Sequence, residues 1–157
     1  MKFLLTLALL LTSCFSIKTS ITIDAPANTV WAILQDTSAY PEWNSFLRID
    51  GKLATDETVH ITVMPPQEKP MSFSPSVLHN TPYDLMWRGR VLMPGLFTGE
   101  HNFRVDVKSQ SQSVFHQDED FSGILVPFIS LKNSETGFKK MNEELKARAE
   151  NFERAKH

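Results

Sequence analysis

The chain has 157 residues, of which 41% are hydrophobic and 22% are charged, and its formal net charge is −2. This length and composition are typical of one globular domain that can fill its own core. A domain that binds nucleic acid usually carries a basic patch or a strong positive charge. Because this chain shows neither, we predict no nucleic-acid partner.

The first residues form an apolar leader. One lysine precedes ten uncharged residues, Phe3 to Thr12, and small residues follow. This pattern is typical of a secretory signal, and the run is too short to cross a bilayer. The sequence Leu-Thr-Ser-Cys at residues 11–14 also resembles a bacterial lipobox, in which Cys14 would be lipidated.

We therefore predict that residues 1–16 are a signal peptide or lipoprotein-type leader and that residues 17–157 form the domain. The protein would then be exported to the cell envelope or periplasm, and a lipidated Cys14 would associate it with a membrane through the N-terminus. The alternatives are a leader cut elsewhere, or a start codon placed too early in a cytoplasmic protein.

A strand and a short helical region open the domain. Residues 17–24 alternate between apolar and polar side chains, which predicts a half-buried strand. Pro26 stands where a helix can start, and apolar residues at helical spacing follow it. Pro41 is expected to hold Tyr40 outside helical geometry, so the helix should end before them.

The middle of the chain alternates with the period of strands. Six segments show it, at residues 45–50, 58–64, 71–78, 83–91, 100–108 and 113–121. Pro75 lies inside the third segment and indicates an edge strand or a bulge. From Leu131 onward the spacing becomes helical, and the apolar positions are Phe138, Met141, Leu145 and Phe152. Grouped strands with helices at the ends predict an α+β fold, in which an antiparallel sheet is covered by the last helix.

Polar residues interrupt the apolar face of two adjacent strands. If their hairpin is centred on Gln110, residues whose numbers sum to 220 lie opposite one another. His101 then faces Glu119, and Phe103 faces Gln117. A slip of one residue would destroy this pairing, so it is a sharp prediction. The pair could orient a ligand's polar group or act as a carboxylate-backed general base; alternatively, the two side chains only satisfy each other.

Several stretches resemble one known superfamily. The opening IDAPANTVWAILQDTSAYPEWN is its strongest match, supported by MWRGR, GLFTGEHNF, EDFSGIL and the terminal GFKKMNEELKARAE. These residues are similar to the START-like or SRPBCC superfamily, whose helix-grip fold is shared by the birch pollen allergen and the polyketide cyclase/dehydrase-type proteins. The resemblance covers Ile17 to Glu153.

The resemblance implies a strongly curved seven-stranded antiparallel sheet, two short N-terminal helices, and a long C-terminal helix over an apolar cavity. Most relatives bind or carry hydrophobic small molecules, and a minority cyclise or dehydrate aromatic polyketides. The residues expected to line the cavity are Trp43, Phe73, Trp87, His101, Phe103, Gln117, Glu119, Phe121 and Met141.

Other aromatic and apolar stretches have two interpretations. Trp31, Tyr40 and Trp43 would form the wall or rim of the cavity, or would only pack the short helices on the sheet. Residues 123–131 are uncharged and would border the cavity mouth, touch a membrane in a lipid-anchored protein, or pack at the joint between sheet and helix.

Three functional hypotheses follow. The first is a monomer that binds a hydrophobic small molecule or lipid. The second is a cyclase or dehydratase that uses His101 and Glu119. The third is an interaction protein whose cavity is filled by its own side chains, among them eleven phenylalanines. No metal or cofactor is predicted, because the histidines are scattered and lack the ligand spacing of a zinc site.

Overall fold

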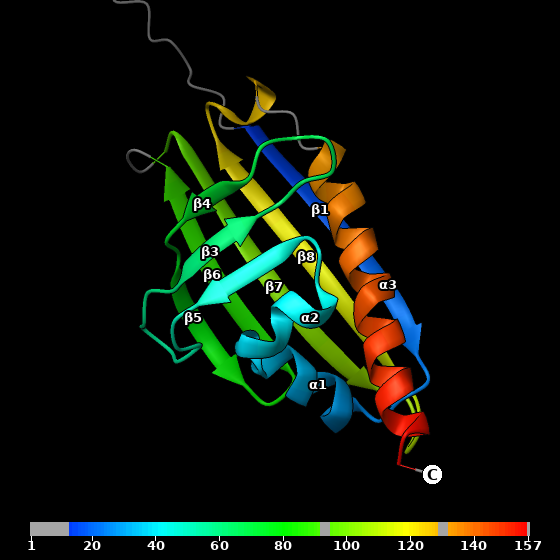
Figure 1. Cartoon of the computed structure of the whole chain (residues 1–157). Coiled ribbons are helices and arrows are strands. Elements are labelled where there is room, and N and C mark those ends of the chain that lie inside the picture. Colours follow the sequence, from blue (N-terminus) through cyan, green and yellow to red (C-terminus); the bar gives the residue numbers. More distant parts are fainter. Residues whose placement is uncertain (1–12, 92–94, 129–131, 157) are drawn as a thin grey trace, which may run out of the picture.

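The computed structural model describes residues 13–91, 95–128 and 132–156, and within them eight strands form two antiparallel sheets. The larger sheet has the order β1-β8-β7-β6-β5 and the smaller has the order β2-β3-β4. The small sheet, the short helices and the long helix α3 all lie on one face of the large sheet (Figure 1).

The large sheet contains β1 (Ser13–Ile23), β5 (Ser76–Thr81), β6 (Asp84–Val91), β7 (Phe97–Val107) and β8 (Ser113–Gly123). The small sheet contains β2 (Leu47–Asp50), β3 (His60–Val63) and β4 (Met71–Phe73). The helices are α1 (Ala27–Gln35), α2 (Tyr40–Trp43), α3 (Lys132–Arg154) and the 3-10 turns η1 (Thr37–Ala39) and η2 (Val126–Phe128).

The predicted α+β fold, with a curved antiparallel sheet and a long C-terminal helix, is confirmed. The strand count differs by one, because the predicted strand 71–78 is two strands that belong to different sheets. The break falls at Pro75, which has no N–H to donate to a sheet. Its carbonyl still accepts a hydrogen bond from the Val59 N–H, at 3.1 Å.

The first strand begins earlier than predicted. β1 starts at Ser13, so residues 13–16 of the predicted leader pair with β8, and exposed Cys14 lies opposite Ser122. Residues 1–12 of that leader, and residues 129–131 of the apolar segment 123–131, lie outside the described residues. Cleavage of the leader and lipidation of Cys14 stay predictions.

The expectation for Tyr40 was wrong. Tyr40 has helical angles, φ −53° and ψ −40°, and begins α2 with Pro41 in its first turn. A proline is tolerated there because the first helical N–H groups have no intrahelical acceptor. The buried Tyr40 hydroxyl donates to the Leu34 carbonyl at 2.8 Å, and burial raises the pKa of Tyr40, helped by the charge of Asp36.

The inner stripe of α3 packs on the large sheet. Phe138, Met141 and Leu145 are buried as predicted, and Ala149 continues the stripe. Phe152 was expected to join them but is 52% exposed. It instead carries the Lys156 ammonium 4.6 Å from its ring centroid.

Polar side chains also attach α3 to β1. Asn142 on the helix donates to the Thr19 hydroxyl at 3.0 Å, and that hydroxyl donates to the Gln117 carbonyl of β8 at 2.9 Å. Further along, Lys146 donates to the Thr22 carbonyl at 2.8 Å and contacts Glu150 at 2.7 Å. The hydrogen bond from Lys146 holds the pKa of Glu150 below its ordinary value, and the Asp24 N–H adds to the effect.

Gly137 in α3 makes room for the aromatic ring of Phe46, the residue just before β2. A Cβ at Gly137 would lie 2.0 Å from Cε2 of Phe46, which is too close for any real contact. The Phe46 ring also meets the Phe138 ring edge-on, with centroids 5.7 Å apart. Gly137 therefore sets how closely the chain after α2 can approach the helix.

We predict that Gly137→Ala destabilises the protein, although alanine is the better helix former by about 1 kcal/mol. The added methyl group forces Phe46 to move, and overpacking of this kind typically costs about 1–3 kcal/mol. Chemical denaturation measures the change. A double-mutant cycle with Phe46→Leu should recover part of the loss, whereas a single variant more stable than the parent would contradict the packing argument.

A second prediction concerns acid. A carboxyl whose pKa is lowered by folding stabilises the native state above its unfolded pKa, here near 4.5, and that stability is lost as the pH falls through the folded value. Glu150→Gln should therefore lose less free energy of unfolding between neutral and acidic pH than the parent does. The exposed Glu143→Gln is the control; equal acid sensitivity of all three proteins would refute the assignment.

Candidate functional site

The polar residues of the inner face come together as the hairpin register predicted. β7 and β8 pair His101 with Glu119 and Phe103 with Gln117, and β6 places Trp87 opposite His101. Two-residue periodicity directs all five side chains to the face that α3 covers. The predicted pairing is therefore confirmed.

His101 is held by aromatic rings on several sides. Its imidazole stacks on the Trp87 ring with centroids 4.7 Å apart and planes 6° apart. The rings of Phe103 and Phe138 meet it edge-on, with centroids 4.8 and 5.0 Å away. The histidine is only 4% exposed, so its orientation is fixed by packing from the sheet and from α3.

Both nitrogens of this imidazole face protein groups. Nδ1 lies 3.3 Å from Oε2 of Glu119, and Nε2 lies 3.4 Å from Nε2 of Gln117. A carboxylate accepts and an amide nitrogen donates, so these neighbours fit a neutral ring with its proton on Nδ1. In this assignment His101 donates to Glu119 and accepts from Gln117.

Gln117 is fully buried and only half satisfied. Its Nε2 contacts His101 and also lies 3.6 Å from the Met141 sulfur. Its Oε1 has no hydrogen-bond partner among the described residues. A buried acceptor without a donor typically costs about 1–3 kcal/mol, so a donor that reached this oxygen would relieve that cost.

Two glycines, Gly89 and Gly99, leave a part of the inner face without side chains next to Trp87 and His101; we call this part the glycine floor. Gly89 of β6 lies directly opposite Gly99 of β7 on the inner face. A Cβ at Gly99 would come 2.8 Å from Oε1 of Glu119, and a Cβ at Gly89 would come 3.4 Å from the Phe73 ring. The carboxylate of Glu119 and the ring of Phe73 therefore occupy space that two ordinary side chains would fill.

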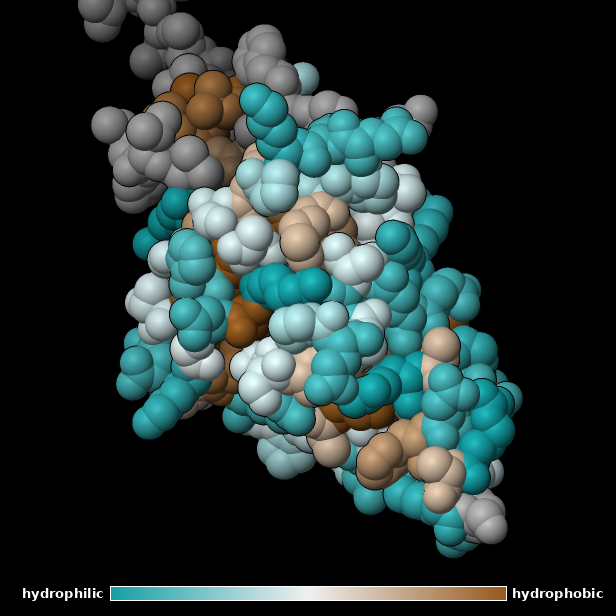
Figure 2. Space-filling view, viewed as in Figure 1, coloured by the Kyte–Doolittle hydropathy of each residue, from teal (hydrophilic) through white to brown (hydrophobic). Residues whose placement is uncertain are grey.

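Solvent reaches the inner face at this end. The Glu119 side chain is 17% exposed. Phe73 and Phe97 are half-buried, whereas Trp87 and Phe103 are buried. Phe97 packs on Phe121 with ring centroids 5.6 Å apart. Over the middle of the face turned to the viewer in Figure 2, hydrophobic atoms show in gaps between hydrophilic residues, and a larger hydrophobic group lies at the upper left.

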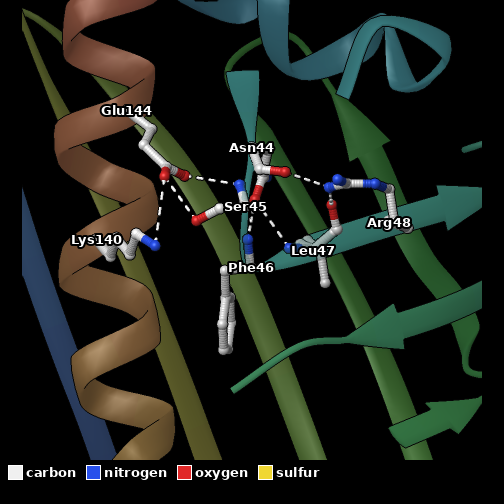
Figure 3. Close-up of polar contacts among 7 residues, drawn as sticks. All are labelled: Asn44, Ser45, Phe46, Leu47, Arg48, Lys140 and Glu144. Atoms are coloured by element: carbon white, nitrogen blue, oxygen red, sulfur yellow. Dashed lines mark hydrogen bonds and ion pairs between the residues drawn. The ribbon is translucent and has the colours of Figure 1, made fainter. Parts of the chain in front are cut away.

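The junction after α2, residues 44–48, is held by hydrogen bonds within itself and to α3 (Figure 3). Asn44 Oδ1 accepts hydrogen bonds from the N–H groups of Phe46 and Leu47, at 2.9 and 2.8 Å. Ser45 donates to Glu144 of α3 through its N–H and its hydroxyl, at 2.8 and 2.6 Å. These bonds hold Phe46 against Phe138, the ring that borders His101.

Arg48 and Lys140 complete this junction. The Arg48 guanidinium donates to the carbonyls of Asn44 and Leu47, and Lys140 lies 4.0 Å from Glu144. Trp43 packs on Tyr40 with ring centroids 4.9 Å apart, and its predicted place in the cavity lining stays a prediction. No ring contact joins it to the His101 group within the part of the chain that the structure describes.

The sequence interpretation overlooked the glycine floor, although a signal for it was present. Gly89 follows Trp87 by two residues and Gly99 precedes His101 by two, so both belong to the same inner face. Phe46 and Gly137 were also missed, because their contact joins segments distant in sequence. Across residues 13–91, 95–128 and 132–156, no group of three or more His, Cys, Asp or Glu side chains could hold a metal ion. Within these same ranges, no helix has the length and apolar character needed to cross a membrane.

Comparison with solved structures shows the same fold in proteins of low sequence identity. A START superfamily protein from Mycobacterium smegmatis is 17% identical, with a TM-score of 0.67 over 87% of this chain and 98% of that one. The ZhuI aromatase/cyclase from Streptomyces sp. R1128 is 14% identical, with a TM-score of 0.68 over 88% and 94%. Norcoclaurine synthase from Thalictrum flavum is 12% identical, with a TM-score of 0.67 over 90% and 98%.

Comparison with family models is more specific. None of the curated proteins matches the chain by sequence. The model described as "Polyketide cyclase / dehydrase and lipid transport" matches residues 15–155. This match spans nearly all of the described domain and agrees with the helix-grip arrangement of sheet and α3. The chain therefore belongs to the polyketide cyclase/dehydrase and lipid-transport family of the START-like (SRPBCC) superfamily.

Proposed function

We propose that this protein binds a hydrophobic small molecule with a hydrogen-bond donor, held inside the fold between the curved sheet and α3. The observation that carries the proposal is the buried Oε1 of Gln117, which has no partner among the described residues. Rings of Trp87, Phe103 and Phe138 surround the same group, so the rest of the ligand should be apolar.

The charges around the site favour a neutral ligand. Glu119 is the acidic member of the group, and its carboxylate lies within 3.3 Å of His101. A ligand carboxylate placed here would meet a like charge in a poorly solvated space, which disfavours binding. An alcohol or phenol, which can donate to Gln117, suits the site better than a fatty acid.

The bare floor at Gly89 and Gly99 supports a route for the ligand. Phe73 covers Gly89 from a strand of three residues, and the Glu119 end of the inner face is the end that solvent touches. A ligand that displaces the Phe73 ring would first meet Glu119 across the two glycines. Gln117 lies one inward position further along β8, beyond the His101–Glu119 pair, so the ligand reaches it only by passing these side chains.

Acid–base catalysis by His101 and Glu119 is the second hypothesis, and the geometry favours it less. A general base must reach the proton that it takes from the substrate. Both nitrogens of His101 already face Glu119 and Gln117. The imidazole therefore suits orientation of the neighbouring amide better than proton transfer to a substrate.

The first test compares two probes of similar shape, 2-naphthol and 2-methylnaphthalene, by native mass spectrometry and fluorescence titration of the full chain. We expect 2-naphthol to bind more tightly, because only its hydroxyl can donate to Gln117. Gln117→Met should weaken 2-naphthol by about five- to tenfold, the value of one hydrogen bond, and leave 2-methylnaphthalene unchanged.

The same substitution also removes the Nε2 donor to His101, so we expect it to lower the free energy of unfolding by about 1–3 kcal/mol, which chemical denaturation measures separately from the probe affinities. The matched control is Gln112→Met, in the turn between β7 and β8, and this variant should bind both probes as the parent does. Equal affinity of the parent for the two probes, or an unchanged preference in Gln117→Met, would contradict the proposal. Failure of both probes to bind would support a filled interior instead.

The second test compares a substitution at Gly99, which lies against Glu119, with one at Gly89, which lies against Phe73. Gly99→Ala places a methyl group against the Glu119 carboxylate, which should move and break the hydrogen bond with His101. Long-range 1H–15N NMR of the histidine ring should then show a changed Nδ1 signal. Gly89→Ala, which meets Phe73 instead, should leave that signal unchanged; an unaltered His101 spectrum in Gly99→Ala would refute the arrangement.

A further inference from the structure

A hollow lies outside the fold's interior, between α1 and the turn that joins β5 to β6. The two segments lie side by side at one end of the large sheet (Figure 1). The hollow has a volume of about 380 Å³ and is lined by Asn28, Trp31, Ala32, Gln35, Asn80, Thr81, Pro82 and Tyr83. None of these residues belongs to the site around His101, so the hollow is a separate feature of the surface.

Helical spacing builds one wall of the hollow. The four residues that α1 contributes are spaced three and four apart, which places them on one face of the helix. That face is not the buried one, which carries Val30 and Leu34. Because Trp31 and Gln35 lie one turn apart, an aromatic ring and an amide stand side by side.

The opposite wall brings a second ring. Tyr83 meets Trp31 edge-on, with ring centroids 6.1 Å apart, and both side chains are half-buried. Tyr83 has φ +69°, a left-handed conformation that a bulky residue adopts rarely. Such strain persists only where the surroundings over-determine it, and it recurs at functional sites. Here the strained turn presents the tyrosine to the tryptophan.

Amide groups form the polar part of the hollow. Asn80 donates to Gln35 Oε1 at 2.7 Å and to the Leu53 carbonyl at 2.5 Å. Gln35 Nε2 is buried and has no hydrogen-bond partner among the described residues. The wall of the hollow therefore contains one buried donor without an acceptor, and the Gln35 amide must turn outward before a ligand in the hollow can reach it.

The lining contains no ionisable acid, base or histidine side chain apart from the tyrosine phenol. Without a cation it lacks the usual means of holding a phosphate or carboxylate. A purely apolar ligand would leave Gln35 Nε2 unsatisfied. The chemistry that fits is a neutral ring with an apolar face for Trp31 and Tyr83 and hydroxyl groups for the amides.

We propose that this hollow binds a neutral carbohydrate, with a sugar ring against Trp31 and Tyr83 and a hydroxyl oxygen accepting from Gln35 Nε2. The site is independent of the interior site and would be occupied whether or not that site holds a ligand. The protein would then bind a second class of partner, a glycan or glycoside. The volume of about 380 Å³ is large enough for a small ligand.

The test is a 1H–15N NMR titration of the full chain with cellobiose and maltose. We expect saturable shifts of the Trp31 indole and Gln35 side-chain amide signals for at least one sugar, with a Kd of about 1 mM. Gln35→Met keeps the length of the side chain and removes the donor, so it should weaken binding about fivefold or more. Gln110→Met, in the exposed β7–β8 turn, should bind as the parent does.

Two further results would overturn the proposal. One is the absence of shifts at Trp31 and Gln35 for both sugars. The other is tighter binding of 2-naphthol than of either sugar at these signals, which would make the hollow a general apolar site. Because Gln117→Met leaves the hollow intact, loss of sugar binding only in Gln35→Met distinguishes this site from the interior one.

Discussion

The structure depends on one constraint: buried polar groups on the inner face of the large sheet take their partners from α3 and the neighbouring strands, and Gln117 Oε1 is left without one. Thr19, His101 and Gln117 are all buried there. The helix supplies Asn142 to Thr19 and the Phe138 ring to His101, while β8 supplies Glu119. A buried polar group without a partner is expensive, so these contacts fix where α3 lies as firmly as its apolar stripe does. The site and the helix position are therefore one arrangement.

Fold likeness leaves the function open, because proteins that share this architecture at 12–17% identity need share no chemistry. The chemistry of this protein is set by its own residues. His101 is engaged at both nitrogens, which favours a binding role over proton transfer. The neighbouring Glu119 carboxylate is expected to disfavour acidic ligands. These features support the proposed binding of a neutral, mostly apolar molecule.

The sequence predicted the elements whose evidence is local. Alternation and a hairpin centre were enough to pair His101 with Glu119, because strand register follows arithmetically from the turn. Pro75 indicated an irregularity in the predicted strand 71–78. That the two halves of this strand belong to different sheets depends on their pairing with distant strands. Contacts such as Phe46 with Gly137, and the hollow beside Trp31, join segments far apart in the chain. No periodicity reports such contacts, so only the structure reveals them.

The pairing of the first strand with the last has a consequence for folding. β1 forms its ladder with β8 alone, so residues 13–23 wait for residues 113–123. Contacts this distant in sequence raise the contact order, and high contact order slows folding because long loops must close first. During synthesis, residues 13–23 have no strand to pair with until residues 113–123 have emerged. An unpaired strand is a template for aggregation, so this protein is most vulnerable before its final hairpin is complete.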